Sequence, residues 1–123
     1  MPGWCNGGAG FVHLWLEADA VIGGRRFLEL ATAAASGVWQ DRGVAWDLCC
    51  GRAGGAYALL ALHRRTGRRV WLERARELGG QAVRAARADS SSRPWSLYRG
   101  LPGIAVLADE LDRPADARMP LFA

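Results

Sequence analysis

The side chains best suited to chemistry in this sequence are its three cysteines. Cys5 lies in the segment Trp-Cys-Asn-Gly-Gly-Ala-Gly, and Cys49 and Cys50 lie in Leu-Cys-Cys-Gly-Arg-Ala-Gly. Thiolates are common ligands of zinc, and three protein ligands leave the fourth tetrahedral position open, as in catalytic zinc sites. We therefore predict that Cys5, Cys49 and Cys50 together bind one Zn²⁺ ion. An odd number of thiols cannot pair fully as disulfides, which favours a metal or a catalytic role.

The spacing of the cysteines alone does not show whether they bind a metal ion. Cys5 lies far from the Cys49–Cys50 pair in the sequence, so the three do not form a zinc-finger knuckle. Free cysteine is also among the residues most often buried in protein cores without any chemical role. A set of buried, metal-free thiols therefore remains the alternative to a zinc site.

An internal repeat makes convergence of the thiols plausible. Gly-x-x-Gly occurs at residues 7–10, 51–54 and 100–103, with a cysteine two residues before the first two copies and Tyr98 before the third. Each copy opens an apolar run, at residues 11–20, 55–62 and 104–111. Repeats of this length are typical of stacked helical hairpins. Equivalent turns of neighbouring hairpins lie at the same end of such a stack, which would bring Cys5 and Cys49 together.

The remaining pattern predicts an all-α fold in a single domain, 1–123. Residues 24–37 and 70–88 read as amphipathic helices of an outer layer, whereas the runs after the glycine turns are apolar nearly all round and suit an inner layer. No segment alternates with period two, so we expect no strand. Linkers are expected at 39–47 and 89–95, and residues 112–123 are expected to be extended over the surface.

Composition excludes several classes of function. All 16 basic residues are arginines, and the net charge is +4. The arginines are scattered without interleaved aromatic residues, so we expect no nucleic-acid partner. No apolar run approaches the roughly 20 residues that span a bilayer, and the start lacks the features of a secretory signal. We expect no membrane association and a cytoplasmic location.

Other candidate residues are weaker. His13 lies in the first apolar run, where it either approaches the cysteines or is a satisfied core histidine, and His63 lies at a helix end without expected chemistry. Asn6 would donate a hydrogen bond near the metal or only shape the turn. Trp4 and Trp46 flank the cysteines and are expected to line a pocket. No catalytic residue and no nucleotide-binding residue is assigned.

The glycine motifs resemble those of a known family. Residues 3–10, 48–54 and 96–104 closely resemble the last three repeat motifs of the lanthionine synthetase C-like (LanC) family, and residues 117–122 are similar to its C-terminal end. The resemblance covers essentially the whole chain. It implies a helical-hairpin α/α toroid, of which this chain would form an incomplete part.

The resemblance also implies a site and a reaction. The family supplies zinc ligands from the positions of Cys5, Cys49 and Cys50; many members have histidine at the last position, so this chain carries an all-cysteine variant. The implied reaction joins a cysteine of a dehydrated precursor peptide to a dehydroalanine or dehydrobutyrine of the same peptide. Three thiolates around Zn²⁺ would leave one net negative charge, which keeps an incoming sulfur electron-rich.

The resemblance implies missing parts as well. The earlier repeats of the family have no counterpart before Met1, so we expect the C-terminal part of a cyclase domain: a truncated frame, a split half or a decayed copy. Such a segment would be active only with its N-terminal portion supplied in trans. The alternatives are a non-catalytic zinc-binding helical-repeat module that binds a peptide or partner protein, and a metal-free structural fragment.

Overall fold

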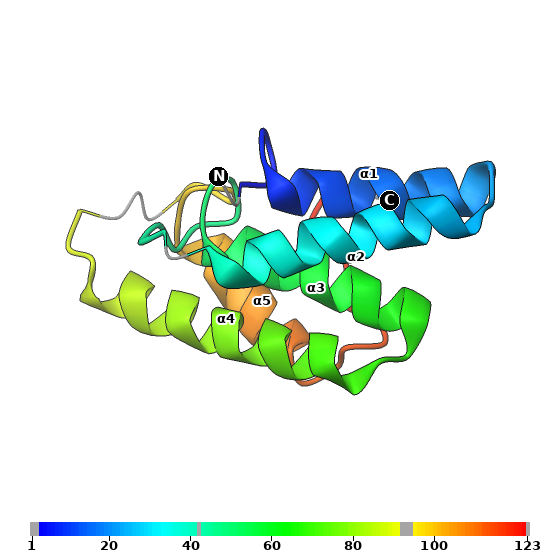
Figure 1. The fold of residues 1–123 in the computed structure, drawn as a ribbon. Coiled ribbons are helices and arrows are strands. Elements are labelled where there is room, and N and C mark those ends of the chain that lie inside the picture. The colour runs from blue at the N-terminus through cyan, green and yellow to red at the C-terminus, as the bar shows by residue number, and fades with distance from the viewer. Residues whose placement is uncertain (1–2, 42, 92–94, 123) are drawn as a thin grey trace.

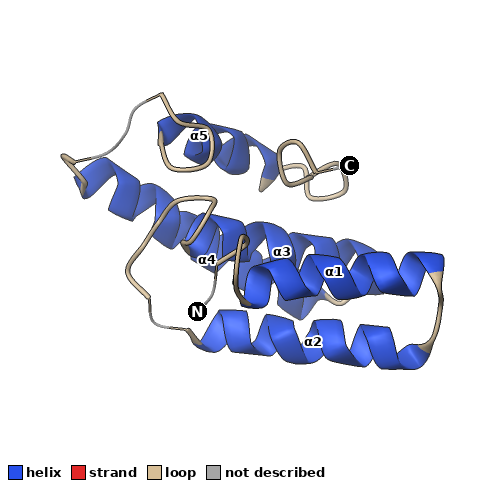
Figure 2. Cartoon of the chain, turned by 90° about the horizontal axis from the view of Figure 1, so that it is seen from above, coloured by secondary structure: helices blue, strands red, loops and turns tan. Residues whose placement is uncertain are grey.

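The computed structural model describes residues 3–41, 43–91 and 95–122 (Figures 1 and 2). These residues form five helices and no strand, which confirms the all-α prediction. The helices are α1 (Gly8–Val21), α2 (Arg25–Gln40), α3 (Arg52–Thr66), α4 (Arg69–Ala88) and α5 (Leu101–Glu110). The expected linker 89–95 falls partly outside the described residues.

The helices are arranged as two hairpins and the start of a third. α1 packs against α2 and α3 packs against α4, while α3 also contacts α1 on one side and α5 on the other (Figure 1). α1, α3 and α5, which follow the glycine turns, are therefore successive members of one layer, and α2 and α4 cover it. This is the arrangement of an α/α toroid segment.

Each inner helix begins inside its glycine turn. The first glycine of each motif has an extended backbone and is the residue immediately before the helix, as seen at Gly7, Gly51 and Gly100. The helices therefore start three residues before the apolar runs that predicted them. The reason is that the three residues after the first glycine already form the opening helical turn.

The second glycine of each motif is required by close packing. A Cβ atom at this position would collide with the carbonyl oxygen of the residue six positions upstream. The three pairs are Gly10 with Trp4, Gly54 with Leu48, and Gly103 with Leu97. Because the same contact recurs in all three copies, the loop before each inner helix folds back on the first helical turn in the same way.

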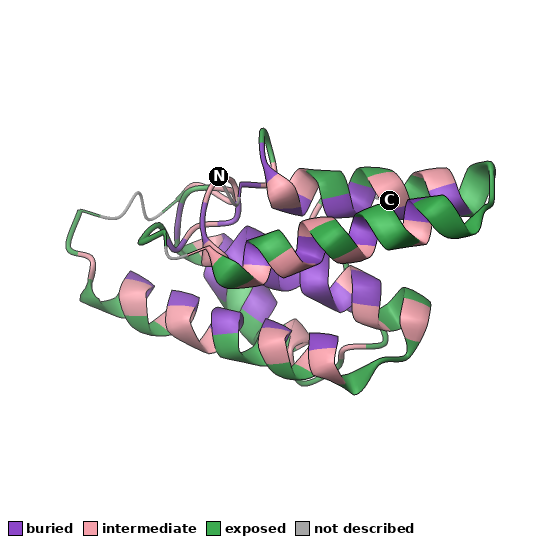
Figure 3. Ribbon diagram, viewed as in Figure 1, coloured by how far each residue is buried: buried purple, intermediate pink, exposed green. Residues whose placement is uncertain are grey.

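The two layers differ in how they are buried (Figure 3). α4 buries one face, whose members recur at steps of three and four residues: Trp71, Ala75, Leu78, Gly79, Ala82 and Ala86. α3 is buried around most of its circumference, from Ala53 to Leu60 and at Leu62. The amphipathic and all-round apolar patterns thus predicted the outer helix α4 and the central inner helix α3.

The other inner helices are less enclosed than predicted. On α1, Phe11, Leu14 and Val21 are 52%, 51% and 82% exposed, and on α5, Leu101 and Val106 also remain exposed. α3 lies between two inner neighbours, whereas in the described part of the chain α1 and α5 each have an extensive contact with one inner helix, α3. One side of each edge helix is therefore uncovered.

Two boundaries also differ from the predictions. α2 continues to Gln40, so Trp39 belongs to the helix and not to the linker. The segment after α5 contains turns and is anchored, because Ala117 and Met119 are buried and the Tyr98 hydroxyl donates to the Pro120 carbonyl over 2.5 Å. The prediction of an extended surface tail was wrong, since apolar side chains of this segment enter the core.

Candidate metal centre

Backbone hydrogen bonds hold the three glycine turns side by side. The Cys49 carbonyl accepts from the amides of Trp4 at 2.8 Å and Cys5 at 3.4 Å. The amide of Cys49 in turn donates to the Tyr98 carbonyl at 3.0 Å. Cys5, Cys49 and Tyr98 occupy the same position of their repeats, so the repeat itself brings the thiols together.

The three sulfur atoms form a compact triangle. The Sγ atoms of Cys5 and Cys49 lie 3.3 Å apart, those of Cys49 and Cys50 3.4 Å, and those of Cys5 and Cys50 3.7 Å. Ligands about 2.3 Å from a tetrahedral zinc ion would be separated by about 3.8 Å. The donor set therefore fits such an ion with small adjustments, and it is the one cluster of potential metal ligands among the described residues. The predicted convergence is confirmed, whereas the binding of zinc itself stays a prediction.

The thiols suit a cation electrostatically. Hydrogen bonding to Cys49, followed by burial and the proximity of Cys5, raises the pKa of Cys50 to about 12. Burial opposes ionisation of Cys49, but interactions with the thiols of Cys5 and Cys50 and with the guanidinium of Arg99 outweigh it and lower the pKa of Cys49. One thiol thus ionises readily while its neighbour resists a second negative charge. A divalent cation would remove this conflict because it stabilises thiolates.

The turn around the pair is fixed by Asp47. Its carboxylate accepts a hydrogen bond from the Cys50 amide at 2.8 Å, and its carbonyl accepts from the Gly51 amide at 3.1 Å. Asn6 lies beside the first thiol, where its side-chain oxygen accepts from Cys5 over 3.6 Å. The site is open, since Cys5 is exposed and the other two cysteines are only partly buried. An incoming ligand therefore has access.

A cleft of about 450 Å³ adjoins Cys50. It is lined by residues of the two linkers and of the second and third turns: Val44, Ala45, Trp46, Asp47, Cys50, Asp89, Ser91 and Arg99. Trp46 is among these lining residues, which confirms the prediction that it lines a pocket. Its indole donates a hydrogen bond to the Asp89 carboxylate at 2.8 Å. Trp4 instead stacks on Tyr98, with ring centroids 5.4 Å apart.

Sequence reasoning missed Arg99. Its guanidinium lies near Cys49, and its interaction with the thiols of Cys49 and Cys50 raises the pKa of Arg99. The repeat contained the signal, because the residue immediately before the first glycine is Asn6, then Cys50, then Arg99. The third turn thus contributes a cation at the position where the second contributes a thiol.

The histidines lie away from the sulfur triangle. His13 is buried and packs against Phe122 with ring centroids 5.1 Å apart. Its Nε2 atom has no hydrogen-bond partner among the described residues. His13 also does not belong to the cluster formed by the three cysteines. His63 lies in the last turn of α3, and its ring Nδ1 atom is 3.0 Å from the carbonyl oxygen of Arg68, which precedes α4.

The fold and the site define a class of protein. A family model described as lanthionine synthetase C-like protein matches residues 1–120, and the chain belongs to this family. It is 33% identical over 124 residues to a zebrafish (Danio rerio) protein named Glutathione S-transferase LANCL1, and 34% identical over 125 residues to LanC-like protein GCL1 of Arabidopsis thaliana. These alignments cover 97% and 95% of this chain, but only 30% and 29% of the relatives. Within the described residues, no helix is both long and apolar enough to cross a membrane.

Proposed function

We propose that this chain provides the zinc-binding part of a domain that joins a thiol to an electron-poor alkene. In the leading form, a peptide cysteine adds to a dehydroalanine or dehydrobutyrine of the same peptide and forms a lanthionine thioether. The sulfur bonds to the β carbon, and a proton is placed on the α carbon, so no atom is lost. The single observation that carries this proposal is the triangle of Cys5, Cys49 and Cys50.

The residues of the site divide the work. Cys5, Cys49 and Cys50 would hold the ion, and Asp47 fixes the turn that carries the adjacent pair. A bound Zn²⁺ would lower the pKa of a substrate thiol, which is otherwise about 8.5 and mostly protonated at neutral pH. Arg99 lies beside Cys49 and offsets the negative charge of the thiolates. The exposure of Cys5 leaves a side from which a peptide can approach.

A second candidate uses the same thiol addition with different reactants. The relative named Glutathione S-transferase LANCL1 is 33% identical over 97% of this chain. Glutathione would then provide the thiol, and a separate electrophile would receive it. A third candidate is a zinc-binding helical-repeat module that binds a peptide or partner protein without catalysis. The chain spans about 30% of the curated relatives it matches, so each activity is assigned to a complete domain.

Metal binding is tested first and independently of activity. The chain, purified without chelator, should contain one zinc ion per chain by elemental analysis, and Cys50→Ala should contain far less. Cys50→His retains a metal-binding side chain and should recover most of the zinc. A parent protein without zinc, even after reconstitution, would contradict the site.

Activity is tested with the chain combined with the N-terminal repeats of a family member. A dehydrated peptide with one free cysteine should lose its free thiol without a change of mass if the chain serves cyclisation. In a mixture that also contains glutathione, an increase of the peptide mass by one glutathione would favour the second candidate. If the chain binds zinc but catalyses neither reaction in any mixture, the non-catalytic module is the remaining candidate. Cys50→Ala is the control in every mixture.

A further inference from the structure

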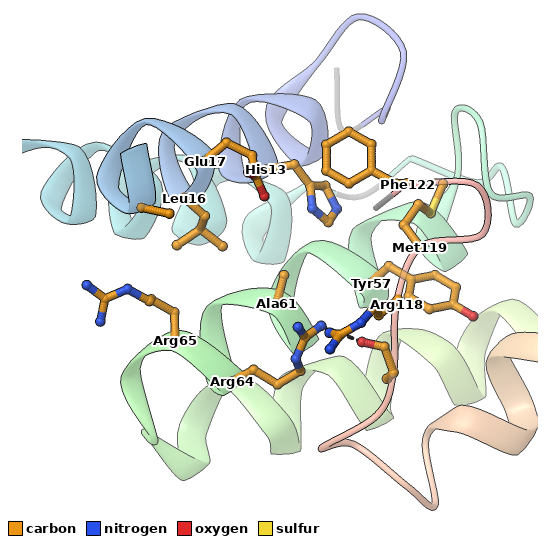
Figure 4. A pocket seen from close by; sticks show the side chains of 12 residues that line it. His13, Leu16, Glu17, Tyr57, Ala61, Arg64, Arg65, Arg118, Met119 and Phe122 are labelled. Carbon is orange, nitrogen blue, oxygen red and sulfur yellow. Dashed lines mark hydrogen bonds between the residues drawn. The ribbon is translucent and has the colours of Figure 1, made fainter. Parts of the chain in front are cut away.

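A second cleft, of about 480 Å³, lies between α1, α3 and the segment after α5 (Figure 4). We call it the His13 cleft. It has apolar walls that include Leu16, Met119 and Phe122, and it is edged by charged side chains. None of the three cysteines lines it. It is therefore distinct from the candidate metal centre and has no role in the function proposed above.

The cleft contains a buried polar atom without a partner. His13 is 6% exposed, its imidazole is directed into the cleft, and its Nε2 atom has no hydrogen-bond partner in the described part of the chain (Figure 4). Leaving such an atom unsatisfied costs about 1–3 kcal/mol. The ring packs against that of Phe122, with centroids 5.1 Å apart. A polar atom of a bound molecule would satisfy it.

Two arginines at the cleft are poised for an anion. Arg64 and Arg118 both line the cleft. Burial and, after it, the charge of Arg118 lower the pKa of Arg64, and the carboxylates of Asp116 and Glu110 only partly offset this effect. Arg64 donates to the Ala117 carbonyl, but neither arginine forms an ion pair within residues 3–41, 43–91 and 95–122. Arg65 differs, because it is paired with the buried Asp19 at 2.6 Å.

We propose that the His13 cleft binds a small organic monocarboxylate with an apolar body. The carboxylate lies between Arg64 and Arg118, since a guanidinium group matches a carboxylate in shape and charge. The apolar body packs against Phe122 and Leu16, and a polar atom of the ligand faces His13. A single negative charge is favoured over a phosphate dianion, because the carboxylate of Glu17 also lines the cleft.

The histidines provide a site-specific assay. The sequence has only two, so a chain labelled with ¹³C-histidine gives two imidazole signals, which His63→Gln assigns. The probe is 3-(4-hydroxyphenyl)propionate, whose hydroxyl can face His13, and its matched control is the neutral 3-(4-hydroxyphenyl)propanamide. Titration with the acid should shift the His13 signal and leave that of His63 in place. A ligand of this size is expected to have a dissociation constant of about 1 mM.

Charge variants complete the test. Arg118→Gln should weaken binding of the acid by about tenfold, as expected for the loss of one charge-assisted hydrogen bond. Arg84→Gln removes an exposed arginine of α4 and should leave binding unchanged. Thermal unfolding of both variants controls for folding. Equal binding of acid and amide, an unmoved His13 signal, or equal affinities of the two variants would each overturn the proposal, whatever the zinc content.

Discussion

The close approach of Gly54 to the Leu48 carbonyl predicts opposite effects for two chemically identical substitutions. Both Gly54 and Gly37 lie inside helices, where replacing glycine by alanine alone stabilises by about 0.5–1 kcal/mol. A Cβ at Gly37 meets nothing within 4 Å, so Gly37→Ala should show this gain. A Cβ at Gly54 meets a backbone oxygen that no side-chain rotation removes. Overpacking costs about 1–3 kcal/mol, so Gly54→Ala should be destabilised by about 2 kcal/mol.

The assay is urea unfolding of both variants and the parent, with thermal unfolding as a second measurement. The two variants should differ by about 3 kcal/mol, which corresponds to about 10 °C in melting temperature for a domain of this size. Because Leu48 directly precedes Cys49, Gly54→Ala should also release zinc at a lower chelator concentration. Equal stability of Gly54→Ala and Gly37→Ala would refute the packing argument for the second glycine of the repeat.

Three further predictions concern other sites. Burial lowers the pKa of His13 to about 4, below its unfolded value of 6.5. The stability due to its neutral form is therefore complete above pH 6.5 and falls by up to about 3 kcal/mol as the pH approaches 4. The free energy of unfolding of His13→Phe, measured in urea, should lack this pH dependence. Tyr57→Phe removes a 2.6 Å hydrogen bond to Glu110 and should lower the free energy of unfolding by about 1–2 kcal/mol, whereas an unchanged value would show that the bond contributes nothing. A zinc chelator should lower the melting temperature of the parent but not of Cys5→Ala, because only a folded chain that binds the ion is stabilised by it.

The repeat explains why much of the fold and the site was predictable. A spacing of glycines fixes the same backbone turn three times, and stacking of hairpins then places Cys5 and Cys49 at one end. That inference requires no knowledge of side-chain packing. The same alignment would have found Arg99, had every position of the motif been compared and not only the cysteines.

Other features depend on tertiary packing that no single segment encodes. The exposure of Phe11 is set by which helices lie beside α1, and an apolar pattern reports only that a face can be buried. The unsatisfied Nε2 of His13 likewise depends on Phe122, which is more than a hundred residues further along the chain. Burial of Met119 was missed because a proline-containing tail reads as irregular, although irregular backbone can still insert side chains into a core.

Tyr98 shows how one position of a repeat can be put to a different use. In two turns that position carries a thiol. In the third it carries a phenol, whose ring stacks on Trp4 and whose hydroxyl donates a hydrogen bond to the Pro120 carbonyl. The copy without a thiol thereby connects the segment that contains Pro120 to Trp4, the residue next to Cys5. A displacement of residues near Pro120 would therefore be transmitted through Tyr98 to Trp4, beside Cys5, and a change in the fluorescence of Trp4 would report it.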